Sequence, residues 1–313
     1  MEFTGHPRQA SRRAQGGNSV PNNFREDTPN LAKNEFEVYY NCSPSVVMDR
    51  FHGHSFYELR TVIHGHILHY NESSISELCS GDISIIPPGL FHRIMPAQDT
   101  GTIPDYTRIL LYLSINFVRS LDTETLQVSE MLNHFGYSGP QHLRLLDEEF
   151  AAFCQLLKDV VTADNDDEPL GHFANRARVM LALSQIARAI SQNAFLPPSG
   201  ENTALIPRVI AYINAHLSSD LSLDMLSERF YISKFYLSHQ FKQYTQLSLH
   251  QYILSRRMMH AQILLRSGHA PTHVAAACGY REYSSFYKAF LRETGINPKG
   301  FVFRILKNSY LDH

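Results

Sequence analysis

No hydrophobic run in the sequence approaches the roughly 20 apolar residues of a membrane-spanning helix, which argues against a membrane protein. The N-terminus carries arginines but lacks the apolar core of a signal peptide, so we expect the protein in the cytoplasm. Cysteine is scarce as well: the 4 cysteines among 313 residues are scattered and form no CxxC pair. This spacing favours buried free thiols in a reducing compartment over disulfides or a zinc knot.

A large net charge is also lacking, but the formal charge of −2 conceals an asymmetry. Residues 204–313 contain 13 lysines and arginines against 6 acidic residues, whereas the rest of the chain contains 15 against 24. A basic segment suits a polyanion such as nucleic acid, and an acidic segment does not. The length suits two domains, and the C-terminal one is therefore the candidate for nucleic-acid binding.

Hydrophobic patterning divides the N-terminal half into a tail and a β-rich region. Residues 1–33 are rich in Gly, Asn, Arg, Ser and Pro without a hydrophobic period, which predicts a disordered tail. From residue 34 to about 113, eight short β-type runs alternate with turn signals such as Pro87-Pro88-Gly89. Their regular spacing predicts a small antiparallel barrel or sandwich.

After the β-rich region the hydrophobic period becomes helical. Residues 121–133, 146–161 and 171–192 each carry apolar residues at helical spacing. The last segment has a stripe that is expected either in the core or at a dimer surface; it comprises Phe173, Val179, Leu183, Ile186 and Ile190. We therefore predict an α+β chain of two domains. Residues 34–195 form a β-rich domain with flanking helices, 196–205 a linker, and 206–313 an all-helical domain that is the candidate for DNA binding.

Two helix-turn-helix patterns occur in the basic half, at about 221–245 and 271–294. In the first, Ser222 and Ser233 are placed to cap consecutive helices. In the second, Gly279 supplies the turn. The second helix of such a unit enters the major groove, so its outward side chains are candidates for DNA contacts. In the first unit these are Lys234, Phe235, Tyr236, Ser238, His239 and Lys242, and in the second Tyr283, Ser284, Tyr287, Lys288 and Arg292.

The double unit resembles the AraC/XylS family of bacterial transcription regulators over about 100 residues. The residues that carry the resemblance are Tyr252-Ile253, Arg257, Ala261, Leu264-Leu265, Val274-Ala275, Gly279-Tyr280, Ser285-Phe286, Phe290, Gly295, Pro298 and Phe301. Gln246, Leu249 and Leu291 depart from the usual Gly, Pro and Lys. The resemblance implies a double-stranded DNA operator, a small-molecule effector and, in the family's usual mode, activation through contact with RNA polymerase. A homodimer is also expected.

A second constellation lies in FHGHSFYELRTVIHG, residues 51–65. His52, His54 and Glu58 share one face of a strand if pairing continues through Ser55-Phe56. Together with GDISIIPPGLFH, residues 81–92, the spacing resembles the two motifs of the cupin barrel, with Pro96 in place of the final Asn. By this resemblance His52, His54, Glu58 and His92 either ligate Fe, Mn, Zn or Ni or line a metal-free effector pocket.

Other residues near these motifs are weaker candidates. Tyr57 and Arg60 flank the site and are expected to contact the effector. His64, His66 and His69 are explained either as solvated strand histidines or as extra ligands.

The sequence therefore predicts a cytoplasmic, sequence-specific transcription regulator, an activator controlled by a small molecule such as a sugar bound in the cupin-like barrel. No enzymatic turnover and no obligatory cofactor are expected, with a divalent metal as an option. Two alternatives remain open. One is a metal-dependent cupin enzyme fused to a DNA-binding module. The other is a constitutive DNA-binding protein whose barrel only oligomerises.

Overall fold

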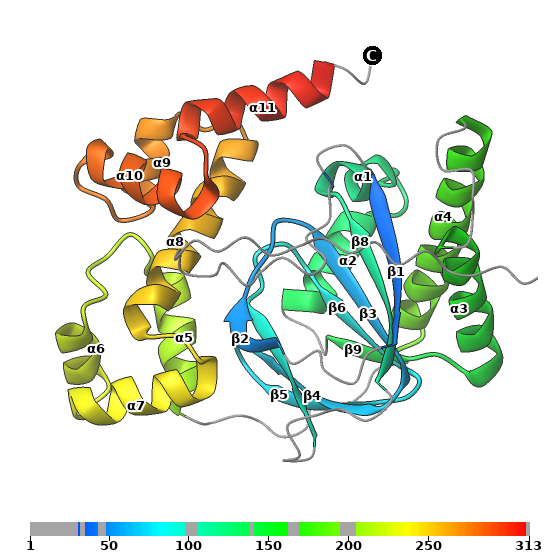
Figure 1. Ribbon diagram of the computed structural model, residues 1–313, viewed down its shortest axis with the longest axis horizontal. Coiled ribbons are helices and arrows are strands. Elements are labelled where there is room, and N and C mark those ends of the chain that lie inside the picture. The colour runs from blue at the N-terminus through cyan, green and yellow to red at the C-terminus, as the bar shows by residue number, and fades with distance from the viewer. Residues whose placement is uncertain are drawn as a thin grey trace, which may run out of the picture.

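The computed structural model describes residues 31, 35–42, 48–97, 106–137, 141–161, 169–194 and 205–310. A β-rich N-terminal part lies beside an all-helical C-terminal part (Figure 1), which confirms the predicted two-part α+β class. The tail predicted over 1–33 lies outside the described residues apart from Leu31, as does the linker over 196–205 apart from Leu205. In the described part of the chain, no helix is long and apolar enough to cross a membrane.

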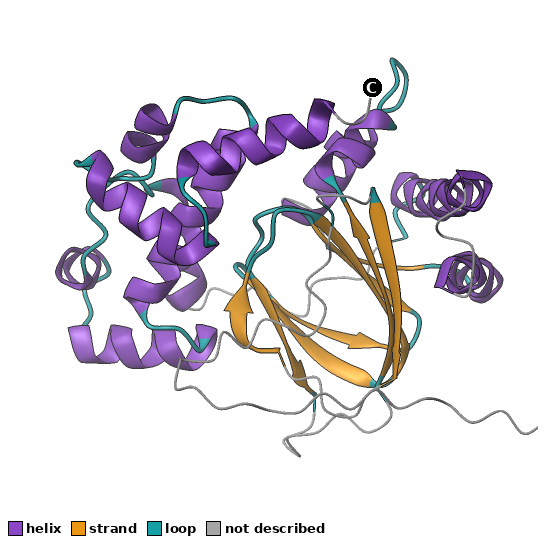
Figure 2. Ribbon diagram, turned by 45° about the horizontal axis from the view of Figure 1, so that its top comes forward, coloured by secondary structure: helices purple, strands orange, loops and turns teal. Residues whose placement is uncertain are grey.

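Two antiparallel sheets form the N-terminal part and face each other (Figure 2). The five-stranded sheet has the order β1 (Phe36–Cys42), β8 (Thr107–Leu113), β3 (Tyr57–His64), β6 (Asp82–Ile86) and β9 (His142–Arg144). The four-stranded sheet has the order β2 (Met48–His52), β7 (His92–Pro96), β4 (His66–Asn71) and β5 (Ile75–Cys79). The eight predicted runs correspond to β1–β8. Strand β9 was not predicted because three residues are too few to show a period of two.

Alternation along the strands gives the five-stranded sheet two different faces. Its outer face carries Leu59, Ile85 and Leu111, which are buried against helices. These helices are α1 (Ile115–Ser120), α2 (Val128–Tyr137), α3 (Asp147–Val161) and α4 (Pro169–Ser191). The helix predicted over 121–133 begins only at Val128, because Asp122 accepts the backbone N–H of Ser129 (2.8 Å) from outside the helix.

The side chains on the inner faces of both sheets form the barrel interior, here called the lumen. Toward one end the lumen is closed by apolar side chains that pack together, namely Val62, Ile67, Leu78, Ile94 and Tyr106. Toward the other end of the same strands the inward side chains become polar. The fold therefore places apolar and polar groups at opposite ends of the barrel interior.

The C-terminal part consists of α5 (Leu205–Ala215), α6 (Leu223–Arg229), α7 (Lys234–Thr245), α8 (Leu249–Arg266), α9 (Pro271–Ala277), α10 (Tyr283–Thr294) and α11 (Pro298–Tyr310). Ser222 and Ser233 accept backbone N–H groups as the N-caps of α6 and α7. The turn before α10 needs glycine, because Gly279 has φ +76° and an added Cβ would lie 2.7 Å from the Leu217 carbonyl oxygen.

Helix α8 joins the two helix-turn-helix units. Its Tyr252 packs with Leu237 and Phe241 in the core of the first unit. Its Ala261 and Leu265 pack instead with Phe286 and Phe290 of the second unit, among other residues. A change in the position of α8 therefore moves both units.

Candidate functional site

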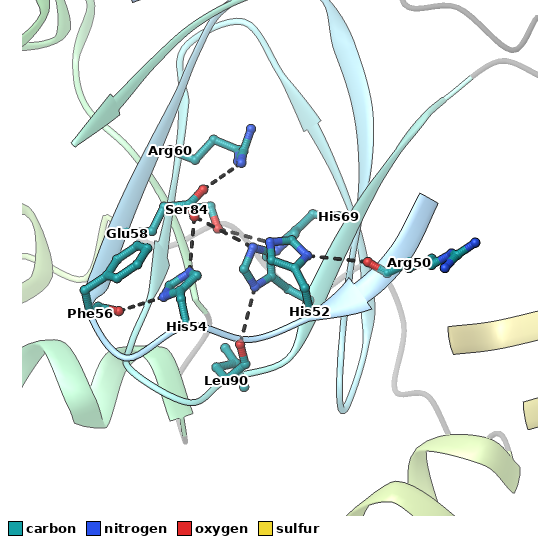
Figure 3. A network of polar contacts seen from close by, with 10 residues as sticks. Arg50, His52, His54, Phe56, Glu58, Arg60, His69, Ser84 and Leu90 are labelled. Carbon is teal, nitrogen blue, oxygen red and sulfur yellow. Dashed lines mark hydrogen bonds and ion pairs between the residues drawn. The ribbon is translucent and has the colours of Figure 1, made fainter. Parts of the chain in front are cut away.

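Polar side chains converge in the lumen from both sheets (Figure 3). His52 ends β2 and His92 begins β7, where the two residues pair in register. Glu58 lies on β3 in the opposite sheet, and His54 lies in the loop between β2 and β3. Strand pairing therefore does not continue through Ser55-Phe56, which was the condition for His52, His54 and Glu58 to share one strand face.

Gly53 lies at the break between β2 and β3. An added Cβ at Gly53 would lie 2.5 Å from the ring of Phe91, so a larger residue there would require the ring or the chain to shift. The carbonyl of His54 then accepts the N–H of Gly89 (2.7 Å) instead of a strand partner. His52 and Glu58 come together because they face each other across the lumen rather than because they share a strand.

Three donor groups of the lumen lie within reach of a single cation. One atom each from His54, Glu58 and His92 lies within 4.8 Å of the others. The Nε2 atoms of His54 and His92 are 3.2 and 3.8 Å from the same carboxylate oxygen of Glu58. His52 is outside this group, although its ring centroid is 4.3 Å from that of His92.

The orientation of the two imidazoles suits metal binding. The Nδ1 atom of His54 lies 2.8 Å from the Phe56 carbonyl, and that of His92 lies 3.3 Å from the Leu90 carbonyl. Because a carbonyl only accepts, Nδ1 carries the proton in each contact and Nε2 turns a lone pair toward Glu58. Backbone acceptors orient metal-binding histidines in this way. A cation between the three donors would make their mutual approach attractive, so the residues fit a divalent metal.

Arg60 forms a buried ion pair with the other oxygen of Glu58, at 2.7 Å. Burial alone would raise the pKa of Glu58, but the Arg60 guanidinium holds that pKa well below its usual value. Burial alone would lower the pKa of Arg60, yet Glu58 raises it above the ordinary value. Glu58 is therefore ionised. One of its carboxylate oxygens binds the Arg60 guanidinium, and the other faces the two histidines.

The two flanking candidates point in opposite directions. Arg60 is inward, opposite Ser84 of β6. Tyr57 is outward: its ring packs under the helices and its hydroxyl donates to Asn133 of α2 (3.0 Å). The position of Tyr57 speaks against the expected effector contact, because an odd offset from Glu58 places it on the other face of β3.

Two lumen histidines lie outside the motif positions. His69 of β4 and His142 of β9 are 0% and 2% exposed, and their ring centroids are 5.1 Å apart. Nε2 of His69 and both ring nitrogens of His142 have no hydrogen-bond partner among the described residues. Burial lowers the pKa of His142 to about 4, and burial followed by His142 lowers that of His69 well below its usual value. Both rings are therefore neutral at pH 7.

The structure also shows whether His64, His66 and His69, predicted to be solvated strand histidines or extra ligands, face the lumen. His69 is not a solvated strand histidine, since it is fully buried. His64 is exposed, and His66 is half-exposed and pairs with Glu77 (2.5 Å) outside the lumen. No sequence signal marked His142, which lies 50 residues beyond His92 on the shortest strand.

The helices α7 and α10 carry the predicted DNA-facing side chains. Helices α6, α9 and α10 lie on the side of α8 away from the barrel (Figure 1), whereas the C-terminal end of α7 contacts the barrel through Tyr244. The exposed candidates are Lys234, Phe235, Tyr236, Ser238, His239, Lys242, Ser284, Tyr287, Lys288 and Arg292, whereas Tyr283 is half-buried. Phe235 is 83% exposed at the start of α7, which is unusual for so large an apolar side chain. Lys234 pairs with Asp224 of α6 (2.8 Å).

Each half of the chain matches a known protein family, and most of the chain is similar to known transcriptional activators. Residues 33–192 match the AraC-like ligand binding domain, and residues 226–303 match a helix-turn-helix domain. The HTH-type transcriptional activator RhaS of Escherichia fergusonii is 26% identical over 251 residues, which cover 79% of this chain and 85% of RhaS. The activator RhaR of Shigella dysenteriae serotype 1 is 26% identical over 263 residues, covering 82% of this chain and 88% of RhaR.

Two solved structures are also similar to parts or most of this chain, both with low TM-scores. ToxT from Vibrio cholerae covers 87% of this chain and 99% of its own, at 12% identity and a TM-score of 0.34. The C-terminal domain of the response regulator AraT from Geobacillus stearothermophilus is 30% identical; it covers 33% of this chain and 87% of its own, with a TM-score of 0.32.

Proposed function

The chain belongs to the AraC family of transcriptional activators, with an N-terminal ligand-binding domain and a C-terminal helix-turn-helix domain, and we propose that a small molecule in the barrel lumen controls how it binds its operator. The polar lumen carries this proposal. A buried polar group without a partner costs about 1–3 kcal/mol. A barrel that served only for oligomerisation would gain nothing from His69 and His142 with unpartnered ring nitrogens among the described residues.

The chemistry of the lumen supports a neutral, hydroxyl-rich effector such as a sugar. Each neutral imidazole offers one hydrogen-bond donor and one acceptor, as a hydroxyl group does. Glu58 and Arg60 already neutralise each other, so the pair favours neither an anionic nor a cationic ligand. The apolar end around Ile67 and Ile94 suits the carbon skeleton of such a molecule.

A divalent metal, Zn, Mn, Fe or Ni, is an option at the same site. His54, Glu58 and His92 would hold it, with His52 beside them. The ion would supply a positive charge that polarises and orients an oxygen of the effector. We propose binding rather than turnover. The enzyme alternative requires a substrate that is consumed when the metal is loaded.

At the DNA, we propose that α7 and α10 enter successive segments of the major groove. The base-reading residues are those near the start of each helix, including Phe235, Ser238 and Ser284, while Lys242, Lys288 and Arg292 bind phosphates. Contact with RNA polymerase would then activate transcription. The protein would act in the cytoplasm, where bacterial DNA lies.

We further propose a homodimer that forms through α4. The expected stripe is divided in the structure: Val179 is buried inside the domain, whereas Phe173 is exposed. A different stripe lies on the surface at helical spacing and consists of Leu170, Phe173, Met180 and Leu181. A second copy of the same helix is the expected cover for this face. A shift to monomer in Phe173→Asp, measured by light scattering, would test it.

A thermal-shift screen of the full chain against sugars, other metabolites and the four metals tests the effector proposal. We expect at least one compound to raise the melting temperature, by mass action on the folded state. The shift should disappear in Glu58→Gln and persist in Glu77→Gln, a matched carboxylate outside the lumen. If stabilising compounds act equally on both variants, the ligand does not bind in the lumen and the proposal fails.

A further inference from the structure

The four-stranded sheet is a wall shared by the lumen and the DNA-binding domain. Its inner face carries His52, His69 and His92. Its outer side carries their neighbours in the sequence, Phe51, Tyr70 and Phe91. Phe51 and Tyr70 contact the ring of Tyr244 at the end of α7, at centroid distances of 5.6 and 5.9 Å. Phe91 contacts Tyr252 of α8 at 5.5 Å. Phe51 and Phe91 are consequently part of the same buried cluster as the first helix-turn-helix unit.

Glu72, the residue after β4, is the polar centre of this contact. Its carboxylate accepts hydrogen bonds from Asn214 of α5 (2.8 Å) and Tyr252 of α8 (3.0 Å). It also forms an ion pair with Arg256 of α8 at 3.0 Å. Only 14% of the Glu72 side chain is exposed. A carboxylate that ties two helices of one domain to a strand end of another fixes their relative position as long as its partners stay in place.

Two hydrogen-bonded paths connect this contact with the lumen. In the first, Asn71 pairs in register with His92 and bonds through its side chain to Gln141, which adjoins His142. The Asn71 carbonyl accepts the hydroxyl of Tyr244 of α7 (3.0 Å). One residue thus touches the lumen wall and the DNA-binding domain.

The second path runs through the peptide groups of Gly89. Its N–H donates to the carbonyl of His54 (2.7 Å), and its own carbonyl accepts Arg256. A ligand that displaces His54 would therefore shift Gly89 and Arg256 and, through Arg256, Glu72.

The contact is also bordered by a pocket. A pocket of about 330 Å³ lies beside it, between Gly89 of the barrel and residues of α5, α8 and α9 that include Asn214, Arg256 and His260. The junction therefore combines the buried cluster around Phe51 and Phe91 with a set of polar bonds that lies beside a pocket. Such contacts between domains permit relative motion.

We propose that the outer side of the β2-β7-β4 sheet is the surface through which the lumen is coupled to DNA binding, and that Glu72 is the positioning residue that holds α8 in register with it. This inference rests on the proposed effector function and names its route. Because α8 contributes to the cores of both helix-turn-helix units, its position sets their arrangement on DNA. Coupling between two sites is reciprocal, so DNA binding must also act on the barrel.

Hydrogen exchange of the full chain, with and without DNA, tests the route without a known effector. The probe is a double-stranded site that the wild-type protein selects in vitro from a random library. We expect DNA to change amide exchange in β4 and β7 by at least about fivefold, the lower end of typical coupling. In Glu72→Gln this change should fall below about twofold while the selected site is still bound. Glu77→Gln, which removes a carboxylate from the neighbouring β5, should respond like the wild type.

Tyr244→Phe provides a variant that keeps the ring and the fold but removes the bond to Asn71. It should lose part of the DNA response, which keeps the test valid if Glu72→Gln unfolds. The inference is overturned if DNA leaves wild-type β4 and β7 unchanged, or if Glu72→Gln responds like Glu77→Gln. Failure to select any DNA site would instead count against the proposed function.

Discussion

The barrel lumen and the outer surfaces of α7 and α10 both collect polar side chains, but in opposite surroundings. In the lumen Glu58, Arg60 and His92 are at most 1% exposed and face one another. On the helices, residues such as Lys242 and Lys288 are exposed. Buried polar groups depend on fixed partners, and removing one partner leaves the other buried without a compensating charge or hydrogen bond. Exposed ones cost the fold little and are available to DNA. The same residue types should therefore control stability in one region and affinity in the other.

The largest contrast is expected between Glu58→Ala and Lys242→Ala. Loss of Glu58 leaves the Arg60 guanidinium buried without its carboxylate, which typically costs about 3–5 kcal/mol. Loss of Lys242 from the surface of α7 should change stability by less than about 0.5 kcal/mol. Urea unfolding followed by circular dichroism measures both. Equal losses for the two variants would remove the distinction between the regions.

The next largest effect is expected in how the stability of the barrel depends on pH. His142 has a pKa of about 4 in the fold, whereas an unfolded histidine titrates near 6.5. Between about pH 6.5 and 4 the unfolded state binds more protons, so the free energy of unfolding falls as the pH is lowered, by at most about 3 kcal/mol from this residue.

His142→Gln should therefore lose less stability than the wild type between pH 7.5 and 5. His134→Gln, at an exposed position of α2, is the control and should keep the wild-type dependence. Melting temperatures at the two pH values are the measurement. An unchanged pH dependence in His142→Gln would mean that this ring is not a source of acid sensitivity.

A smaller effect is expected at the second helix-turn-helix unit. Lys288→Ala should weaken binding to the selected DNA and reduce the slope of log K against log salt by about 0.9, the value for one phosphate contact. The melting temperature should not change. Lys158→Ala on α3, at the far side of the barrel, should leave both quantities as they are. A constant salt slope in Lys288→Ala would contradict the phosphate contact.

The smallest effect is expected for the pair of Lys234 and Asp224, whose side chains are 57% and 67% exposed. Surface pairs of this kind contribute about 0–1 kcal/mol, so Asp224→Ala should hardly alter stability. It should, however, release Lys234 and remove a negative charge near the DNA, which raises affinity severalfold. Fluorescence anisotropy at low salt measures this gain, and a loss of affinity would show that Asp224 positions Lys234 for DNA.

The helical half was largely predictable because its signals are local. Ser222, Ser233 and Gly279 lie next to the helix ends and the turn that they determine. In the barrel, the spacing of His54, Glu58 and His92 identified residues that the fold does bring together. Pairing does not continue from His52 to Glu58, and the close approach of Gly53 to Phe91 at this break is a tertiary contact without a local sequence signal.

Long-range partners carried no sequence signal. His142 reaches the lumen only through the pairing of β6 with β9. Glu72 meets Tyr252 across 180 residues of chain, and periodicity within either segment is unaffected by that contact. The first contact depends on tertiary strand pairing and the second on how the two domains are placed, and local propensity determines neither.

The central claim is that the lumen senses a molecule and alters DNA binding. Its most direct test is a titration of the selected DNA with the full chain, with and without the compound that stabilises the barrel most. We predict a change in Kd of at least about fivefold, which Glu58→Gln abolishes and Glu77→Gln retains. A Kd that stays within about twofold for every stabilising compound would contradict the claim and favour a constitutive DNA-binding protein.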